Sequence, residues 1–207
     1  SRTSMYRNDT KPTDLVESGE SLTSNENFYA IFADKISDGT PPTWTKTALG
    51  SVSAGTYLIC MSDGKVFNGN ISSGHGQVTS SVFATSLTSN TTINEDAPAG
   101  ACEVTFAAVT NGFTMNVPGK GYLYAKGTKT GNLDYHETES EYWFSANSFW
   151  RYHGQNTSGT YVALYDYAHT QFKNSVTTSG TDVYEIILLK KTNAGVPATY
   201  SDYTKSC

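Results

Sequence analysis

Short apolar runs separated by turn-forming residues make up most of the chain. The strongest run, Gly55–Met61, is followed by the pair Asp63 and Gly64 and then by a returning segment. Glycine accepts positive φ at little cost, so an Asp-Gly pair between two such runs predicts a β-hairpin. The runs Phe113–Val117 and Tyr122–Lys126 flank a Pro-Gly-Lys-Gly turn in the same way. The pattern therefore predicts short antiparallel strands, and no helical period lasts longer than about two turns.

Hairpin-containing units recur along the chain at a spacing of about 40 residues. A third hairpin is predicted where 149–153 leads through a polar turn into 161–165, and the strands that close the three units are 104–109, 142–145 and 183–189. Three such units around a pseudo-threefold axis close a small barrel, so the sequence favours an all-β, β-trefoil-like fold. An antiparallel β-sandwich, which also has closely spaced short strands, is the alternative.

The polarity of the chain divides it into three parts. Residues 1–42 have little apolar periodicity before one strand at 27–33, and Pro41 and Pro42 then stop any ladder, so this part is expected to be a partial β module or linker. Residues 43–192 are predicted to form the main all-β domain, with a polar excursion at 71–100. Residues 193–207 are predicted to be a tail or linker.

Length and charge exclude several classes of protein. The chain has 207 residues, enough for one modest core. Its net charge is -5 and its Lys and Arg residues are scattered, which argues against a nucleic-acid partner. No apolar run approaches the roughly 20 residues that span a bilayer, and no signal peptide opens the chain. We therefore expect no membrane insertion, and a mature product or a fragment.

The three cysteines, Cys60, Cys102 and Cys207, have neither an even number nor the spacing of a zinc site. The favoured interpretation is that Cys60 and Cys102 are small strand residues, and a disulfide between them is the alternative. The four histidines lie in or beside polar segments without a partner at metal-binding spacing: His75, His136, His153 and His169. No metal and no cofactor is therefore expected.

Motifs of known catalytic chemistry are missing from the sequence, among them G-x-S-x-G, H-E-x-x-H, the phosphate-binding loop and the dinucleotide fingerprint. Paired carboxylates of the glycosidase kind cannot be identified in this way, because the fold sets their separation. The candidates would be Asp134, Glu137, Glu139 and Glu141. We expect a protein that is not an enzyme, with a hydrolase as the second alternative.

Aromatic residues between 142 and 167 are too dense for one strand face to bury. Alternation places Val162 and Leu164 on one face of a strand and Tyr161 and Tyr165 on the other. If the aliphatic face is the core, these tyrosines point outward, and exposed rings suit the apolar faces of sugars. The candidate ligand-binding residues are Trp150, Tyr152, His153, Tyr161, Tyr165, Asp166 and Tyr167, with Asn156 also at the edge of the groove. The alternative assigns these rings to the core or to cross-strand pairs.

Two segments resemble modules of bacterial surface proteins. The stretch LTSNENFYAIFAD at 22–34 resembles the closing strand of the Listeria–Bacteroides repeat, which implies that the chain starts inside a neighbouring module of a longer protein. The segments WTKT, GTYLI, VFNG, GKGYLY and VYEIILLKK, spread over roughly 43–207, are similar to a non-catalytic accessory β module of secreted multidomain Bacteroidetes proteins. That resemblance implies an extracellular or cell-surface setting and supplies no catalytic residues.

Together, these observations predict a non-catalytic, lectin-like extracellular module that recognises a carbohydrate or glycoprotein through exposed aromatics. Its partner would be a glycan or a host or secreted protein, and other domains of the same protein would flank it. The alternative is a structural or protein–protein interaction module of a larger secreted bacterial protein.

Overall fold

The computed structural model describes residues 2–7, 15–16, 28–33, 35–37, 39–126, 132–139, 141–154, 161–200 and 204–205. Every regular element among them is a β-strand, apart from one short 3-10 turn, η1 (Leu49–Ser51). The prediction of an all-β protein is therefore confirmed. The chain forms two compact units, Pro42–Ala194 and a smaller one made of Ser1–Pro41 and Gly195–Cys207.

The smaller unit contains strands from both ends of the chain. Its strands are β1 (Arg2–Arg7), β2 (Leu15–Val16), β3 (Phe28–Ala33), β4 (Lys35–Ser37), β20 (Thr199–Tyr200) and β21 (Thr204–Lys205). β1 pairs with β2 and β3, and the C-terminal strand β21 pairs with β3. β20 pairs with β4. Residues near the C-terminus thus complete sheets that N-terminal residues begin.

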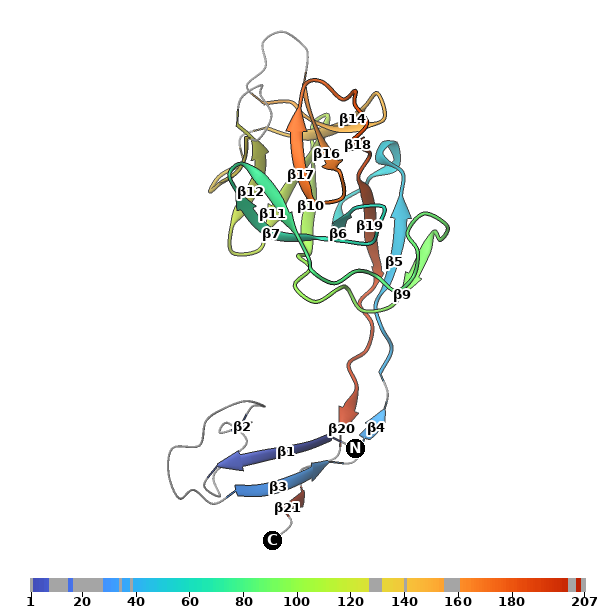
Figure 1. Cartoon of the computed structure of the whole chain (residues 1–207), viewed down its shortest axis with the longest axis vertical. Helices are drawn as coiled ribbons and strands as arrows, with labels where there is room; N and C mark the ends of the chain where they lie inside the picture. The colour runs from blue at the N-terminus through green and yellow to red at the C-terminus, as the bar shows by residue number, and fades with distance from the viewer. Residues whose placement is uncertain are drawn as a thin grey trace. The chain divides into compact units, whose positions relative to one another are not determined.

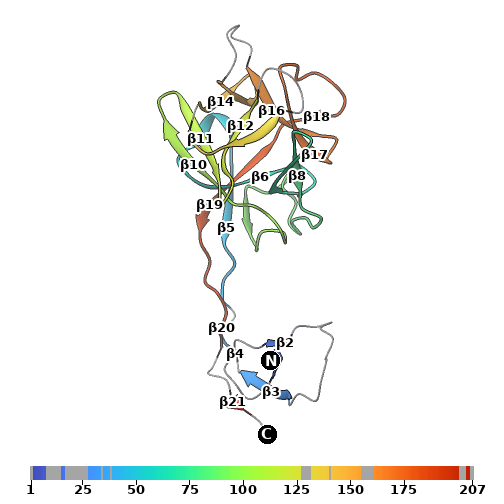
Figure 2. The same cartoon turned by 90° about the vertical axis from the view of Figure 1, so that its left-hand side faces the viewer.

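The larger unit is built on one antiparallel sheet of 15 strands (Figures 1 and 2). The first strands are β5 (Thr43–Thr47), β6 (Gly55–Cys60), β7 (Phe67–Ser72), β8 (His75–Val78), β9 (Thr92–Asn94), β10 (Val104–Val109), β11 (Gly112–Val117) and β12 (Gly121–Ala125). They are followed by β13 (Leu133–His136), β14 (Trp143–Ala146), β15 (Phe149–Tyr152), β16 (Val162–Tyr167), β17 (Gln171–Ser175), β18 (Val183–Tyr184) and β19 (Ile187–Asn193). The main path runs β7-β8-β17-β16-β15-β14-β11-β10-β6-β19-β5-β9.

Strand β6 is buried on both of its faces. Tyr57 and Ile59 belong to the larger of two hydrophobic cores, whereas Leu58 and Cys60 belong to the smaller one. The neighbouring strand β19 divides its leucines between the same two cores. Successive side chains of a strand point to opposite faces, so a strand covered on both sides reads as a continuous apolar run. This explains why the segment GTYLIC gives the strongest strand signal in the sequence.

The prediction of a β-trefoil-like barrel is wrong. The sheet has two end strands, β7 and β9, and no ladder among the described residues joins them, so the sheet is open. An open antiparallel sheet with a core on each face supports the β-sandwich alternative instead.

The threefold pattern fails because the three predicted units pair differently. After the Asp63-Gly64 turn only one bridge, Cys60↔Val66, links the returning segment to β6, and β7 then pairs with β8. The closing strand expected at 183–189 is two strands, and β18 pairs with β16 whereas β19 pairs with β5 and β6. The hairpins β11–β12 and β15–β16 do form as predicted. Regular spacing of turns therefore did not produce regular pairing.

The polar excursion at 71–100 covers the smaller core. It contains two strands that the sequence did not predict, β8 and β9. Three of its apolar side chains are buried in the smaller core: Phe83, Leu87 and Ile93. The nearby Val82 is 47% exposed. A few well-spaced apolar residues are thus enough to hold a mostly polar segment against the sheet.

Candidate functional site

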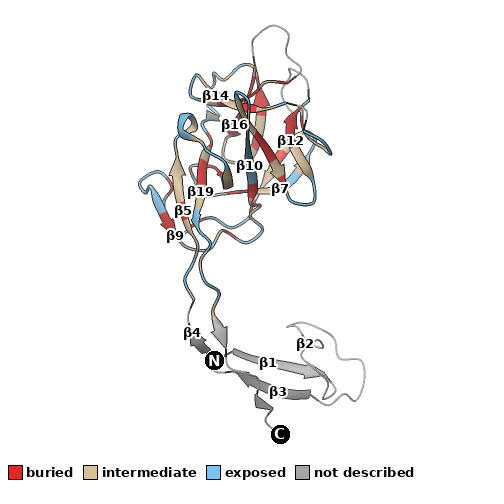
Figure 3. Ribbon diagram, turned by 180° about the vertical axis from the view of Figure 1, so that it is seen from behind, coloured by how far each residue is buried: buried red, intermediate tan, exposed pale blue. Residues whose placement is uncertain are grey.

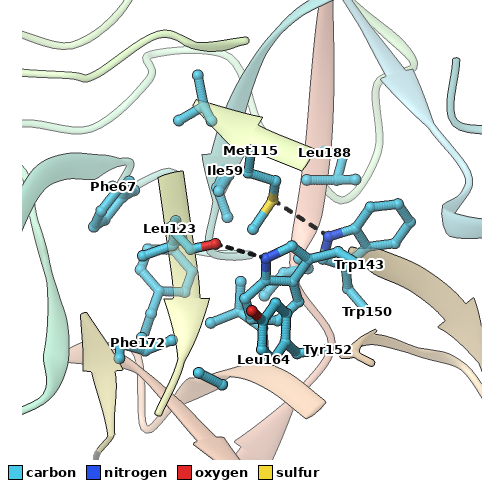
Figure 4. Packing of buried hydrophobic residues seen from close by; sticks show 14 of the residues in the cluster. Ile59, Phe67, Met115, Leu123, Trp143, Trp150, Tyr152, Leu164, Phe172 and Leu188 are labelled. Atoms are coloured by element: carbon cyan, nitrogen blue, oxygen red, sulfur yellow. Dashed lines mark hydrogen bonds between the residues drawn. The ribbon is translucent and has the colours of Figure 1, made fainter. Parts of the chain in front are cut away.

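Three of the predicted ligand-binding aromatics are core residues. Trp150, Tyr152 and Tyr165 are only 1%, 2% and 4% exposed. Figure 4 shows Trp150 inside the larger core, where its Nε1 donates a hydrogen bond to Met115 Sδ at 3.3 Å. The expectation that Trp150 and Tyr165 offer exposed rings to a ligand is therefore wrong.

Strand β16 is covered on both faces, which is why alternation misplaced its tyrosine. The five residues from Val162 to Asp166 are all buried, as Figure 3 shows along this strand. β16 pairs with β15, β17 and β18, so it lies among other strands. Alternation identifies an outward face only where one face of a strand meets water. The aliphatic side chains Val162 and Leu164 do lie in the larger core.

The predicted polar residue Asp166 stabilises the turn between β16 and β17. Its Oδ1 accepts the backbone N–H of His169 at 2.9 Å, and its Oδ2 lies 2.5 Å from His169 Nδ1. Burial raises the pKa of the Asp166 carboxyl, and the contacts with His169 act in the opposite direction. Ala168 and His169 both have positive φ, 51° and 54°, which side-chain-bearing residues rarely adopt. The carboxylate therefore holds an unfavourable turn rather than the edge of a groove.

The last predicted residue of β16, Tyr167, lies away from the others. Its half-buried ring is covered by Lys173, whose Nζ is 3.3 Å from the ring centroid. Tyr167 is six residues after Tyr161 along an extended chain, which corresponds to about 20 Å. The structure thus does not bring Asp166 and Tyr167 together with His153 and Tyr161.

His153 and Tyr161 lie in a half-buried group of rings that we call the outer aromatic cluster: Tyr142, Phe144, His153 and Tyr161. The imidazole stacks between Tyr142, at a centroid distance of 4.4 Å, and Tyr161, at 5.0 Å. Phe144 meets Tyr161 edge-on at 5.1 Å. His153 Nδ1 also lies 3.1 Å from Oε2 of Glu141. The cluster is therefore ordered by its own ring contacts.

The register of β14 and β15 places this cluster opposite the core. Trp143 pairs with Tyr152, and both are buried in the larger core. Trp143 Nε1 donates to the Leu123 carbonyl at 2.8 Å (Figure 4). Because side chains alternate along a strand, the next residue, Phe144, lies on the opposite face.

A depression of about 450 Å³ adjoins the outer aromatic cluster. It lies between η1, the turn that joins β10 to β11, and β14. Its apolar lining includes Leu49, Val52, Phe113, Phe144 and Trp150. This volume falls within the range of roughly 300–1,000 Å³ that is typical of small-molecule sites.

A second depression, of about 360 Å³, is more polar. Its lining includes Thr110, Glu139, Glu141 and Tyr142. Val109 and Asn111 line both depressions, so the two adjoin at the β10–β11 turn. We treat them as one surface and call it the turn groove.

The turn groove opens where β14 leaves β11. These strands share a single residue pair, Phe113↔Trp143. At Gly112 an added Cβ would lie 2.4 Å from the Trp143 carbonyl oxygen and 2.5 Å from Tyr142 Cδ2, so no larger residue fits without movement. Asn111 before it has φ 83°, in the left-handed region that asparagine tolerates better than most residues. This Asn-Gly pair therefore fixes the shape of the groove.

Sequence reasoning missed most of the groove. Tyr142, Phe144 and Phe113 were not among the predicted binding residues, although the Tyr-x-Phe spacing at 142–144 was a signal that two rings share one strand face. Of the four carboxylates considered for catalysis, Glu139 and Glu141 line the groove, whereas Asp134 and Glu137 do not.

Several other predictions concern metals and thiols. No group of three His, Cys, Asp or Glu side chains in the described part of the chain could hold a metal ion. Cys60 and Cys102 are both free thiols, and burial raises the pKa of Cys60 well above its usual value. Cys207 and the predicted groove-edge residue Asn156 lie outside the described residues.

Comparison with known protein families, with curated proteins and with solved structures gave no match. Among the described residues, no helix has the length and apolar character needed to cross a membrane. The resemblance to a Bacteroidetes accessory module and to a Listeria–Bacteroides repeat stays a prediction.

Proposed function

We propose that this protein is a non-catalytic extracellular or cell-surface module that binds a carbohydrate, free or on a glycoprotein, at the turn groove. The observation that carries the proposal is the pair of half-buried aromatic residues, Tyr142 and Phe144, which line the two adjoining depressions of the groove. Aromatic faces suit the apolar C–H faces of sugar rings. Asn111, Glu139 and Glu141 stand beside these rings and offer an amide and carboxylates to sugar hydroxyls.

The setting is part of the same proposal. The resemblance of residues 43–207 to an accessory module of secreted Bacteroidetes proteins supports an extracellular or surface location and flanking domains. The acidic balance of the chain, -5, fits a partner other than nucleic acid.

A glycan array of the purified chain tests the proposal, followed by titration of tryptophan fluorescence with each sugar that binds. Trp150 lines the larger depression, so a sugar bound there should change its emission. We expect Phe144→Ala to abolish binding. The matched control is Tyr184→Ala, which removes a ring that is 40% exposed but lies on β18, away from the groove lining.

A structural or protein-interaction module is the second candidate, and the burial of Trp150, Tyr152 and Tyr165 favours it. A folded chain that binds no sugar on the array would support this candidate and reject the first. A pull-down from host secretions with the wild-type chain and Phe144→Ala would then identify a protein partner of the groove.

A hydrolase is also tested, because a glycosidase needs two carboxylates and Glu139 and Glu141 line one depression. The samples from the binding experiments serve for this test. Both are exposed, whereas a general-acid carboxyl usually lies in an apolar pocket. We expect bound oligosaccharides to be recovered intact. Shortened products that disappear in Glu139→Gln would show a hydrolase instead.

A further inference from the structure

The charges along the turn groove have one sign. Two carboxylates, Glu139 and Glu141, stand on the wall that carries the Tyr142 ring. No lysine or arginine is among the residues that line either depression. A surface of this kind favours a ligand that combines an apolar face with positive charge and disfavours an anionic one.

In the part of the chain that the structure describes, two basic side chains lie near the groove, Arg151 and His153, and both have partners. Arg151 pairs with Phe144 across β14 and β15, but its Nε donates to the Ala146 carbonyl at 3.0 Å and its Nη1 to the Tyr161 carbonyl at 2.8 Å. His153 contacts Glu141 at 3.1 Å, so when protonated it offsets part of that charge. Glu139 keeps the groove acidic in either state of the histidine.

We propose that the ligand of the turn groove is a cationic glycan, an oligosaccharide that contains glucosamine with free amines. This inference rests on the proposed carbohydrate-binding function and narrows it. One sugar ring of the oligosaccharide stacks on Phe144 and Tyr142. The ammonium group of the adjacent glucosamine unit lies over Glu139 and Glu141. Tyr142 adds to the selectivity, because an ammonium group near the face of a tyrosine ring is attracted by its π electrons.

Calorimetric titration with three tetrasaccharides tests the inference: tetra-glucosamine, tetra-N-acetylglucosamine and a tetra-uronate, at a pH where the amines are protonated. An exposed ion pair has a modest effect, so we expect tetra-glucosamine to bind about tenfold more tightly than the acetylated sugar. The uronate should bind most weakly. Salt should reduce the advantage of the amine, because the charges are exposed to solvent.

Variants of the groove separate this selectivity from simple attraction to an acidic protein. Glu139→Gln should remove most of the advantage of the free amine while the acetylated sugar still binds. Glu185→Gln removes an exposed carboxylate outside the groove lining and should change neither affinity. Phe144→Ala should abolish binding of both sugars.

The outcomes that overturn the inference differ from those that overturn the function. If the acetylated sugar or the uronate binds as tightly as tetra-glucosamine, the turn groove binds sugars without a preference for positive charge, and only the inference fails. If tetra-glucosamine binds equally well to Phe144→Ala, or if tetralysine matches it, the attraction is unspecific and the inference fails. If no saccharide binds the folded chain, the proposed function fails and the inference fails with it.

Discussion

The two faces of strands β14 and β15 carry similar aromatic residues in opposite environments. On one face Trp143, Trp150 and Tyr152 are buried in the larger core. On the other, Phe144 joins Tyr142 and residues of neighbouring segments in the half-buried outer aromatic cluster. Adjacent residues, Trp143 and Phe144, thus have different roles because side chains alternate along a strand. Aromatic content makes this region a candidate for a site, and the register decides which rings are buried in the core and which lie in the outer aromatic cluster.

The largest effect that sharpens this comparison comes from removing two buried rings, Trp150 of the larger core and Tyr165 on the other, also buried, face of β16. Trp150→Ala combined with Tyr165→Ala should lower the free energy of unfolding by about 6–10 kcal/mol, a large part of the stability of a typical domain. Each buried aromatic ring costs about 3–5 kcal/mol to remove, and the whole stability of a domain is about 5–15 kcal/mol. Near-ultraviolet circular dichroism and urea titration measure this. A wild-type-like melting curve would place both rings on the surface and contradict their burial.

A matched pair of single changes compares the two faces one residue apart. Trp143→Ala should lower the free energy of unfolding by about 3–5 kcal/mol, because it leaves a cavity in the core. Phe144→Ala should lower it by about 1 kcal/mol, since that ring is only half-buried and loses its contacts within the outer aromatic cluster. Urea unfolding of both variants gives the two values. Equal losses would show that the outer aromatic cluster is as much a part of the core as Trp143.

Much of the fold follows from local signals in the sequence. The continuous apolar run of β6, the turn around Gly119 and the absence of helical periodicity predicted an all-β chain with the β11–β12 hairpin. The pairing order did not follow, because partners far apart in sequence leave little local trace. β6 pairs with β10 and β19, and no periodicity within β6 specifies either partner.

The candidate site was harder to predict for the same reason. Alternation along 161–165 correctly placed Val162 and Leu164 in the core but gave Tyr165 an outward face, since it assumed that only one face is covered. The groove itself depends on where β14 separates from β11. Its residues come from η1, the β10–β11 turn and β14, and sequence patterns within one segment cannot bring such segments together.

A smaller effect is expected from adding a methyl group at Gly112, where the backbone of β11 closely approaches Trp143 and Tyr142. Gly112→Ala places a methyl group against the Trp143 carbonyl and the Tyr142 ring, and overpacking of this kind costs about 1–3 kcal/mol. Because Tyr142 must move, sugar binding at the turn groove should weaken as well. Gly50→Ala is the control for stability alone: Gly50 also lines the larger depression, but it has no heavy atom within 4 Å of its added Cβ and no positive φ. If Gly112→Ala behaves like Gly50→Ala in thermal melts, the close approach of β11 to β14 is not present in solution.

The smallest effect concerns Asp166, a buried polar residue that lies outside both faces of β14 and β15. Burial raises the pKa of this carboxyl above its ordinary value of 3.8. A carboxyl with a raised pKa in the folded state contributes stability that is fully present below about 3.8 and is lost as the pH rises through the folded-state pKa. Asp166→Asn keeps an oxygen that can accept the His169 N–H and does not titrate.

The stability of the wild type relative to Asp166→Asn should therefore fall as the pH is raised from 3 to 6. Urea unfolding of both proteins at half-unit pH steps measures the difference. A wild-type advantage that grows with pH would mean that the contacts with His169 outweigh burial, and that the turn is held by an ion pair. A difference independent of pH would show that this carboxyl does not titrate differently in the folded and unfolded states.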